Sequence, residues 1–370
     1  AVVTHGWTLD AQGHAMHKSA GNAVAPEEFV KESGADILRL WVTSSDYRED
    51  MRCSPEILSR VADSYRKIRN TARYALGNLD GFDPAADPVG LQEMHEIDRW
   101  ALAELDRVVA RCVEAYTAYD FHSVYRALDA FCTVTLSARY FDIIKDRLYT
   151  RAPRSHARRS AQTALNYIAD ALARLLAPVL SFTADEIWEN LPEVKAFHAF
   201  VADGEAAAAE GREGASVTGG TMRVPPSVHA AEFPVAMSVE RDAVLLERWA
   251  RLFEVRDAVL RALEEARTAK LIGSSLEAHV RLEAKRATYE LLEHYREDLR
   301  YVFIVSQVSL ALLEADAGEE LRVRVERAAG QKCERCWNYS TLVGQFTRYP
   351  SACERCVEAL AEIEAEGGAA

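Results

Sequence analysis

Apolar residues recur at spacings of three and four along much of the chain between residues 54 and 190. On an α-helix of about 3.6 residues per turn, positions with this spacing share one face. The clearest stripes are formed by Ile97, Ala101, Leu105, Val108, Val109 and Cys112, by Val124, Leu128, Phe131 and Cys132, and by Leu165, Ile168, Leu172, Leu175 and Leu176. Because the connections between these segments are short, we expect the helices to pack antiparallel as a bundle.

Capping residues predict where several helices begin and end. Pro26, followed by two glutamates, is typical of a first helical turn, and a second short helix is expected over residues 35–42. Ser54 before a proline predicts an N-cap, and the helix that follows should run to about Leu79. Thr183–Glu186 has the capping-box sequence and predicts the start of one more helix.

The pattern changes beyond residue 200. Residues 201–222 are rich in Ala, Gly and Ser and lack an apolar period, which favours a linker or surface insertion. A long amphipathic helix is expected over about residues 240–269. Strands are expected at residues 279–282, 301–305, 308–312 and 321–325, with a short helix at about 288–298. These elements predict a small α+β module.

Composition limits the class of protein. A chain of 370 residues with 49% hydrophobic and 27% charged residues can bury a sizeable core in two to three domains. It has no apolar run of about 18 residues and no secretory signal, so we expect a cytoplasmic protein. Because the sequence opens mid-pattern and without Met, we expect it to be cut from a longer protein.

The charge pattern points to local anion binding. The net charge of −13 argues against a wholly basic nucleic-acid binder. Basic clusters nevertheless occur, formed by Lys145, Arg147, Arg151, Arg154, Arg158 and Arg159, by Arg66, Lys67, Arg69 and Arg73, and by Arg48 and Arg52. Each cluster is either a solvated face or a contact surface for RNA or phosphate, and their number favours the second interpretation.

Four cysteines near the end of the chain have the spacing of a metal site. Cys333-x2-Cys336 and Cys353-x2-Cys356 are separated by 16 residues, which suits four thiolates around one tetrahedral Zn²⁺. Four protein ligands leave no open position, so the zinc should be structural. A redox pair and an iron–sulfur cluster are the alternatives. The isolated Cys53, Cys112 and Cys132 are interpreted as small buried hydrophobes.

Two further segments carry candidate binding residues. Around the cysteines, cations alternate with Trp337, whose ring either stacks on an exposed base or covers the metal site. Near the start, Lys18 and Ser19 lie in a glycine-flanked loop, where a lysine can reach a polyphosphate as a mobile point charge. The cations around the cysteines are Lys332, Arg335, Arg348 and Arg355.

Several segments resemble the class I aminoacyl-tRNA synthetases. Met16–Asn22 is similar to their KMSKS signature loop, although Ala15 and His17 depart from the motif whereas Lys18 keeps its second lysine. Gly34–Trp41 and Asp46-Tyr47 follow the pattern of the same family. Ile68–Tyr74 resembles the first helix of its anticodon-binding bundle, and later bundle segments are similar to Asp142–Arg147 and Ser181–Trp188. Lys332–Trp337 with the later cysteine pair resembles the tail zinc finger of the bacterial isoleucyl branch. No HIGH-type signature occurs, so the resemblance covers only the last part of such an enzyme.

The resemblance implies a mainly α fold. An antiparallel, anticodon-binding helical bundle would follow the end of a Rossmann-type catalytic domain and precede a small α+β module and a zinc finger. The implied parts are residues 1–45 for the end of the catalytic domain with the loop, 46–200 for the bundle, 201–235 for a linker or insertion, 236–326 for the α+β module, and 327–370 for the zinc finger and tail.

The resemblance to the class I aminoacyl-tRNA synthetases also implies a function. The complete enzyme would activate isoleucine with ATP and Mg²⁺ and transfer it to tRNA(Ile), and this part alone would be incomplete and monomeric. Lys18 would be catalytic, and ATP would contact Met16, His17, Lys18 and Ser19. One structural Zn²⁺ would bind Cys333, Cys336, Cys353 and Cys356. The tRNA would contact Arg52, Arg69, Arg73, Lys145, Arg147, Arg335 and Trp337.

Three other classes remain open from the residues alone. A stand-alone RNA-binding zinc protein would bind tRNA without catalysis. A DNA-repair glycosylase has a similar tail finger but needs an amino-terminal Pro-Glu, whereas this chain begins Ala1-Val2. A structural zinc module without a ligand would leave the basic clusters and Trp337 unexplained.

Overall fold

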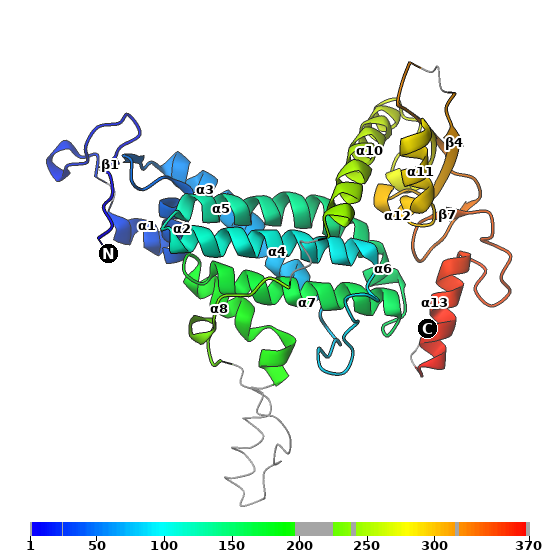
Figure 1. The fold of residues 1–370 in the computed structure, drawn as a ribbon, viewed down its shortest axis with the longest axis horizontal. Helices are drawn as coiled ribbons and strands as arrows, with labels where there is room; N and C mark the ends of the chain where they lie inside the picture. The colour runs from blue at the N-terminus through cyan, green and yellow to red at the C-terminus, as the bar shows by residue number, and fades with distance from the viewer. Residues whose placement is uncertain (1, 24, 197–224, 238–241, 315–317, 368–370) are drawn as a thin grey trace, which may run out of the picture. The chain divides into compact units, whose positions relative to one another are not determined.

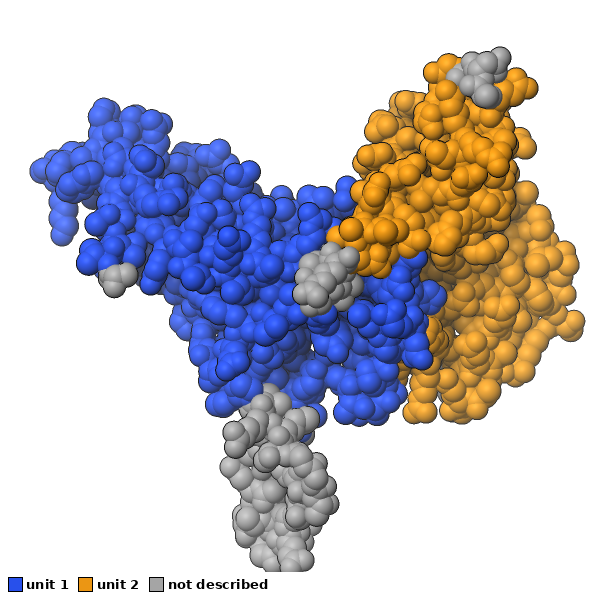
Figure 2. Space-filling model, viewed as in Figure 1, with its two compact units in different colours: residues 1–139, 162–241 blue, residues 140–161, 242–370 orange. Residues whose placement is uncertain are grey.

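The computed structural model describes residues 2–23, 25–196, 225–237, 242–314 and 318–367. The chain divides into two compact units, shown in different colours in Figure 2. Unit 1 comprises residues 1–139 and 162–241, and unit 2 comprises residues 140–161 and 242–370. Both units are built mostly of helices, which confirms the predicted mainly α class (Figure 1). Among the described helices, none is both long and apolar enough to cross a membrane.

The front of unit 1 is a short α/β segment. Strand β1 (Thr8–Leu9) pairs in parallel with β2 (Met51–Arg52), and the 3₁₀ turn η1 (Lys18–Ala20) lies in the loop between them. Helices α1 (Pro26–Ser33) and α2 (Ala35–Ser44) follow where the sequence predicts them.

The bundle of unit 1 buries the predicted apolar stripes. Its helices are α3 (Pro55–Gly77), α4 (Glu96–Thr117), α5 (Phe121–Ala130), α7 (His156–Leu176) and α8 (Ser181–Glu189). Helices α4 and α7 lie side by side in Figure 1, and the Tyr116 hydroxyl of α4 donates to the Leu175 carbonyl of α7 at 2.8 Å. Leu102, Leu165 and Ile168 are fully buried. Ser54 caps α3 as predicted, accepting the backbone N–H of Ile57 at 3.3 Å.

Beyond α5 the chain forms a π-helical segment, η2 (Phe131–Phe141). The Ser137 hydroxyl donates to the carbonyl of Cys132 at 2.7 Å, five residues earlier. A hydroxyl that donates to the carbonyl five residues earlier adds one side-chain hydrogen bond to the widened π-helical turn. The apolar stripe that predicted a helix here is present, but its winding differs from the expected α form.

The helix predicted from the capping box at Thr183 is present, but Thr183 is not its N-cap. Helix α8 begins at Ser181, and Thr183 lies inside its first turn. The cap comes from Asp36 of α2, whose carboxylate accepts the Thr183 N–H at 2.9 Å and the Thr183 hydroxyl at 2.6 Å. The carboxylate of Asp36, on another helix, thus caps α8 in place of a residue of the local sequence. Any well-placed acceptor can satisfy the free N–H groups of a first helical turn.

Residues 225–237 lie against the bundle. Trp188 Nε1 donates to the carbonyl of Pro225 at 3.1 Å, and the Phe233 ring stacks on Tyr116 with centroids 5.2 Å apart. Val228 of the short turn η3 (Val228–Ala230) is buried. The later residues of the predicted 201–235 linker are therefore packed, whereas residues 201–224 lie outside the described part of the chain.

Unit 2 contains a three-stranded sheet covered by helices. The strand order is β4-β3-β5, in which β3 (Ala278–Ala284) pairs in parallel with β4 (Gln307–Leu312) and antiparallel with β5 (Leu321–Arg327). In this register Val280 lies opposite both Val308 and Val325. The helices are α6 (Asp142–Thr150), α10 (Ala243–Thr268), α11 (Arg286–His294) and α12 (Leu299–Phe303), with a 3₁₀ turn η5 (Ser275–Glu277).

The predicted strand at residues 301–305 is wrong. This segment ends α12, and Ile304 then turns the chain with a φ of 57°. A short apolar run does not distinguish a strand from a buried helical turn. Here Phe303 is fully buried, and the Val302 carbonyl accepts Arg256 Nε of α10 at 2.8 Å. The short helix predicted at 288–298 starts two residues earlier and ends at His294.

Candidate metal centre and nucleic-acid interface

The four cysteines of the tail converge on one point in unit 2. Their Sγ atoms all lie within 4.8 Å of one another, and Cys336 Sγ is 3.6 Å from Cys353 Sγ. A tetrahedral zinc with bonds of about 2.3 Å sets its sulfurs about 3.8 Å apart. All four side chains are buried. The cluster therefore has the donor set and the spacing that fit one tetrahedral zinc ion.

Local backbone geometry builds the first pair of ligands. Strands β6 (Gln331–Lys332) and β7 (Tyr339–Ser340) bracket the turn, and the Trp337 N–H donates to the Cys333 carbonyl at 2.9 Å. Gly330 precedes β6 with a φ of 91°, and a Cβ there would lie 2.2 Å from the Ser340 carbonyl oxygen. Only glycine allows the two strands to approach this closely.

The second pair of ligands lies at a helix start. Cys353 is the N-cap of α13 (Glu354–Ala365), and its own N–H donates to Cys333 Sγ at 3.3 Å. Hydrogen bonds from Cys353 and Cys356 lower the pKa of Cys336, because they stabilise its thiolate. In contrast, burial alone raises the pKa of Cys112 to about 12 and also raises that of Cys53. The thiolate of the tail cluster is thus stabilised at Cys336, while the pKa values of Cys353 and Cys356, which donate to it, are raised. The two isolated cysteines behave as buried hydrophobes.

Three of the four finger cations have hydrogen-bond or ion-pair partners inside unit 2. Arg348 pairs with Glu364 at 2.5 Å, and Arg335 and Arg355 both reach α6. Arg335 Nη1 donates to the Thr150 carbonyl at the end of α6 and lies 3.6 Å from Cys356 Sγ. Arg355, whose side chain is 5% exposed, forms an ion pair with Asp146 of α6. Its guanidinium also lies 5.3 Å from the centroid of the Tyr301 ring. Arg335 and Arg355 attach the cysteine module to α6.

Trp337 is the most exposed aromatic ring of the module. Its side chain is 60% exposed, and its backbone has a φ of 66°. Lys332 Nζ lies 4.8 Å from the ring centroid. Because a ring so exposed does not serve as a buried cover for the metal site, the geometry favours the stacking interpretation. The Lys332 ammonium thus lies over one face of the exposed ring.

On α6 the predicted contacts lie among acidic neighbours. Lys145 Nζ is 2.6 Å from Asp142, and the same carboxylate accepts Arg256 Nη2 at 2.7 Å. Arg147 lies on the same helix. The basic cluster at 145–159 is thus partly neutralised by internal ion pairs, which the charge pattern alone did not reveal.

The loop with Lys18 is held closed at its base in unit 1. Asn22 Nδ2 donates to Asp10 at 2.8 Å and to the Ala15 carbonyl at 3.1 Å, while its Oδ1 accepts the His17 N–H at 3.0 Å. The hydrogen bond from Asn22 is the main reason that the pKa of Asp10 lies below its ordinary value. His17, Lys18 and Ser19 are exposed, and Met16 is half-buried. A ligand can therefore reach the cation of this loop.

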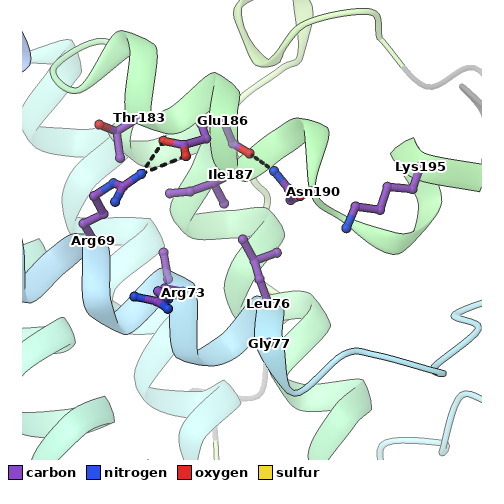
Figure 3. Close-up of a pocket in the computed structure, with 10 residues that line it drawn as sticks. Arg69, Arg73, Leu76, Gly77, Thr183, Glu186, Ile187, Asn190 and Lys195 are labelled. Carbon is purple, nitrogen blue, oxygen red and sulfur yellow. Dashed lines mark hydrogen bonds and ion pairs between the residues drawn. The ribbon is translucent and has the colours of Figure 1, made fainter.

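The other predicted cations of unit 1 lie in two places. Arg52 is on β2, and its guanidinium packs beside Gly13 of the Lys18 loop. Arg69 and Arg73 of α3 instead line a cavity with Glu186 of α8, which accepts Arg69 Nη2 at 2.8 and 2.9 Å. Lys195, which also lines the cavity (Figure 3), and Asp10 were not predicted as site residues, because their roles depend on folded geometry.

Comparison with known protein families gives three matches. The family described as "Anticodon-binding domain of tRNA ligase" matches residues 98–282, which is half of the chain. "tRNA synthetases class I (I, L, M and V)" matches residues 1–54, and "Zinc finger found in FPG and IleRS" matches residues 330–359. The last two matches contain the Lys18 loop and the cysteine cluster.

Individual relatives agree with these matches. The isoleucine–tRNA ligase of Syntrophotalea carbinolica is 49% identical over 98% of this chain and 37% of the relative. That of Geobacter sulfurreducens is 44% identical over 97% of this chain and 36% of the relative. A solved methionyl-tRNA synthetase of Mycobacterium tuberculosis with methionyl-adenylate is 23% identical over 53% of this chain and 39% of that one, with a TM-score of 0.43.

The chain thus spans just over a third of the length of the curated relatives that it matches. Its family matches follow the chain from the Lys18 loop through the bundle to the cysteine cluster. Because half of its residues match the family described as "Anticodon-binding domain of tRNA ligase", the chain belongs to that family.

Proposed function

We propose that this chain is the part of an isoleucine–tRNA ligase that supplies an ATP-contacting loop and recognises the anticodon of tRNA(Ile). The proposal depends chiefly on one observation, the 49% identity to an isoleucine–tRNA ligase over 98% of the chain. In the complete protein, isoleucine and ATP would form an aminoacyl adenylate and pyrophosphate, and the aminoacyl group would then pass to the tRNA. The chain alone is catalytically incomplete under this proposal.

Lys18 is proposed to act when isoleucine attacks the α-phosphate of ATP. Negative charge then builds on the phosphate oxygens and on the departing pyrophosphate. Mg²⁺, when bound in the complete enzyme, would also stabilise this charge. A cation on an exposed loop contributes most when it meets that charge as it develops. The Asp10–Asn22 contact holds the base of the loop, and Met16, His17 and Ser19 complete the proposed ATP-contacting segment.

Cys333, Cys336, Cys353 and Cys356 are proposed to hold one structural zinc ion. When bound, the ion supplies four strong bonds between the turn after β6 and the start of α13, and no chemistry of the reaction. Arg335 and Arg355 keep this module on α6 through Thr150 and Asp146. The resemblance implies that Arg335 contacts the tRNA. Because its guanidinium is bound to Thr150, we propose instead that Arg335 positions the module.

The tRNA is proposed to contact both units. Trp337 and Lys332 would stack on an unpaired base and pair with its phosphate. Phosphate contacts elsewhere would come from Arg52, Arg69, Arg73, Lys145 and Arg147. Of these, Arg69 and Lys145 already have carboxylate partners, so an RNA phosphate must compete with Glu186 and Asp142 for them.

The substitution Lys18→Ala in the full-length protein that contains this chain tests the catalytic part. We expect adenylate formation, measured by isoleucine-dependent pyrophosphate exchange, to slow by about a hundredfold, while isoleucine binding changes by less than about twofold. Lys31→Ala, an exposed lysine on α1, is the matched control and should leave both unchanged. Equal losses in rate and in isoleucine binding would contradict a role in the transition state.

A further inference from the structure

Arg52 is an exposed arginine of unit 1 whose side chain extends to the loop that carries Lys18. A Cβ built on Gly13 of this loop would lie 3.4 Å from Arg52 Nη2 and 3.8 Å from both its Cζ and its Nε. Gly13 has a φ of 89°, a conformation that favours glycine, so no side chain occupies this place. The loop is thus contacted by a cation from β2 in addition to its own lysine.

Backbone pairing places Arg52 in one row with a residue of the loop. Leu9 of β1 pairs in parallel with Arg52 and forms an antiparallel bridge with Ala15. Side chains of directly paired residues lie on the same face of a sheet, and Arg52 and Ala15, two strand spacings apart, are therefore separated by about 10 Å across Leu9. The long arginine side chain can cover most of that distance, whereas alanine leaves the face open at position 15.

The Arg52 guanidinium is available to an anion. Within the part of the chain that the structure describes, it has no hydrogen-bond or ion-pair partner. The acid of the loop, Asp10, is already occupied by the Asn22 amide at 2.8 Å and by two backbone N–H groups. A guanidinium that packs on backbone without an acid keeps its donors free, and its planar fork matches two phosphate oxygens.

The positions of the two cations favour a polyphosphate as the anion. Asn22 closes the loop onto the Ala15 carbonyl at 3.1 Å, so Arg52 lies at the base of the loop and Lys18 in the turn at its tip. Cations at both ends of a short loop can bind different phosphates of one polyphosphate chain at the same time. A phosphodiester of RNA carries a single negative charge and needs only one of them.

We infer that Arg52 binds the polyphosphate of the nucleotide together with Lys18, supplying from β2 a second cation that the loop itself lacks at Ala15. The inference rests on the proposed function, because the nucleotide is the ATP that Lys18 would contact. The proposed function counts Arg52 among the phosphate contacts of the tRNA, and the experiment distinguishes these two sources of phosphate. Arg52 binds the phosphates before and during the reaction alike, so its loss raises KM more than it lowers kcat.

The test compares Arg52→Met with Arg52→Lys in the full-length protein that contains this chain. Both variants keep a long side chain that can pack beside Gly13, but only lysine keeps the charge. In isoleucine-dependent pyrophosphate exchange, we expect Arg52→Met to raise the KM for ATP and for pyrophosphate about tenfold and Arg52→Lys to raise them about threefold. The KM for isoleucine should change by less than about twofold. Arg60→Met, at an exposed arginine of α3, is the matched control and should change none of these values.

A second substitution tests the geometry of the row. Ala15→Lys in the Arg52→Met background places a cation on the same face, at the position that alanine leaves open. We expect it to lower the KM for ATP by about threefold relative to Arg52→Met alone. Ala15→Met in the same background adds similar bulk without charge and should restore nothing. Ala15 is exposed, so the fold should tolerate both changes.

The outcomes separate the inference from the proposed function. A full-length wild type without isoleucine-dependent exchange contradicts the proposed function itself. If the wild type is active but Arg52→Met and Arg52→Lys have the same KM for ATP, the charge plays no part and the inference alone is overturned. It is also overturned if Arg52→Met weakens tRNA binding while the KM for ATP stays unchanged, because Arg52 then contacts the tRNA.

Discussion

Two short polar side chains shape the loop that presents Lys18. The carboxylate of Asp10 accepts the backbone N–H groups of Gln12 and His14 at 3.0 and 2.8 Å, and Asn22 joins it from the far end of the loop. Gly21, with a φ of 70°, lets the chain turn back to that position. The loop thus has a fixed base and an exposed tip, so the lysine can move while its anchor stays in place.

Asn22→Ala should raise the pKa of Asp10 towards its ordinary value of 3.8, because the largest contact that stabilises the carboxylate is lost. A lowered pKa in the folded state means that this contact stabilises the loop above pH 3.8, and that the stabilisation fades as the pH falls through the folded value. NMR titration of the Asp10 carboxyl carbon measures the shift. An unchanged pKa in the variant would contradict the assigned cause.

At this scale, the sequence predicts the metal ligands but not every neighbouring contact. The paired Cys-x2-Cys spacing indicates four ligands without any knowledge of the fold. Arg335 and Trp337 are two positions apart and looked equally available, yet one donates to the Thr150 carbonyl and the other is exposed. That difference depends on a carbonyl 185 residues away in the sequence, which local patterns do not report.

Among the helices, α8 depends on a cap supplied by another element. Asp36→Ala should destabilise unit 1 by about 2 kcal/mol, because it leaves the N–H groups of Phe182 and Thr183 without their acceptor. Hydrogen exchange of those two amides, followed by mass spectrometry, locates the loss. Asp63→Ala, which removes an exposed carboxylate from α3, should cost less than about 0.5 kcal/mol. Equal effects of the two changes would contradict the capping role.

The cysteine module depends on α6 through a buried ion pair. Asp146→Ala leaves the Arg355 guanidinium buried without its carboxylate, and should destabilise unit 2 by about 3 kcal/mol. Urea unfolding monitored by far-UV circular dichroism measures the change. Glu290→Ala breaks the exposed pair with Arg286 in the same unit and should cost less than about 1 kcal/mol. A loss at Asp146 as small as that at Glu290 would show that the pair does not hold the module.

Periodicity predicts elements well where a stripe is long. The stripes from Ile97 and Leu165 became α4 and α7, whose apolar faces are buried. Short patterns fail where a tertiary contact competes, as for the capping box at Thr183, or where an apolar run is short, as at residues 301–305. In both cases the apolar or polar character of the residues was predicted correctly. The local backbone geometry, however, depends on a contact from elsewhere in the chain, from Asp36 to Thr183 and from Arg256 to the Val302 carbonyl.

For the whole molecule, zinc binding and folding of the tail should be coupled. Cys333→Ser should reduce the zinc content from about one ion per chain to near zero and unfold the module, since structural zinc binding supplies folding free energy. Atomic absorption of the purified chain measures the metal. Cys112→Ser, at a buried cysteine outside the cluster, should keep the ion. A Cys333 variant that retains a full equivalent of zinc would contradict the four-cysteine site.

Recognition of the anticodon is the central claim, and binding to a panel of tRNA transcripts over a salt series tests it most directly. The zinc-loaded chain would be offered isoleucine, valine and methionine acceptors, together with an isoleucine acceptor whose anticodon has been changed. The account predicts a preference for the isoleucine acceptor that disappears with its anticodon. Equal affinity for every tRNA, falling steeply and alike with salt, would contradict it by showing only a basic surface.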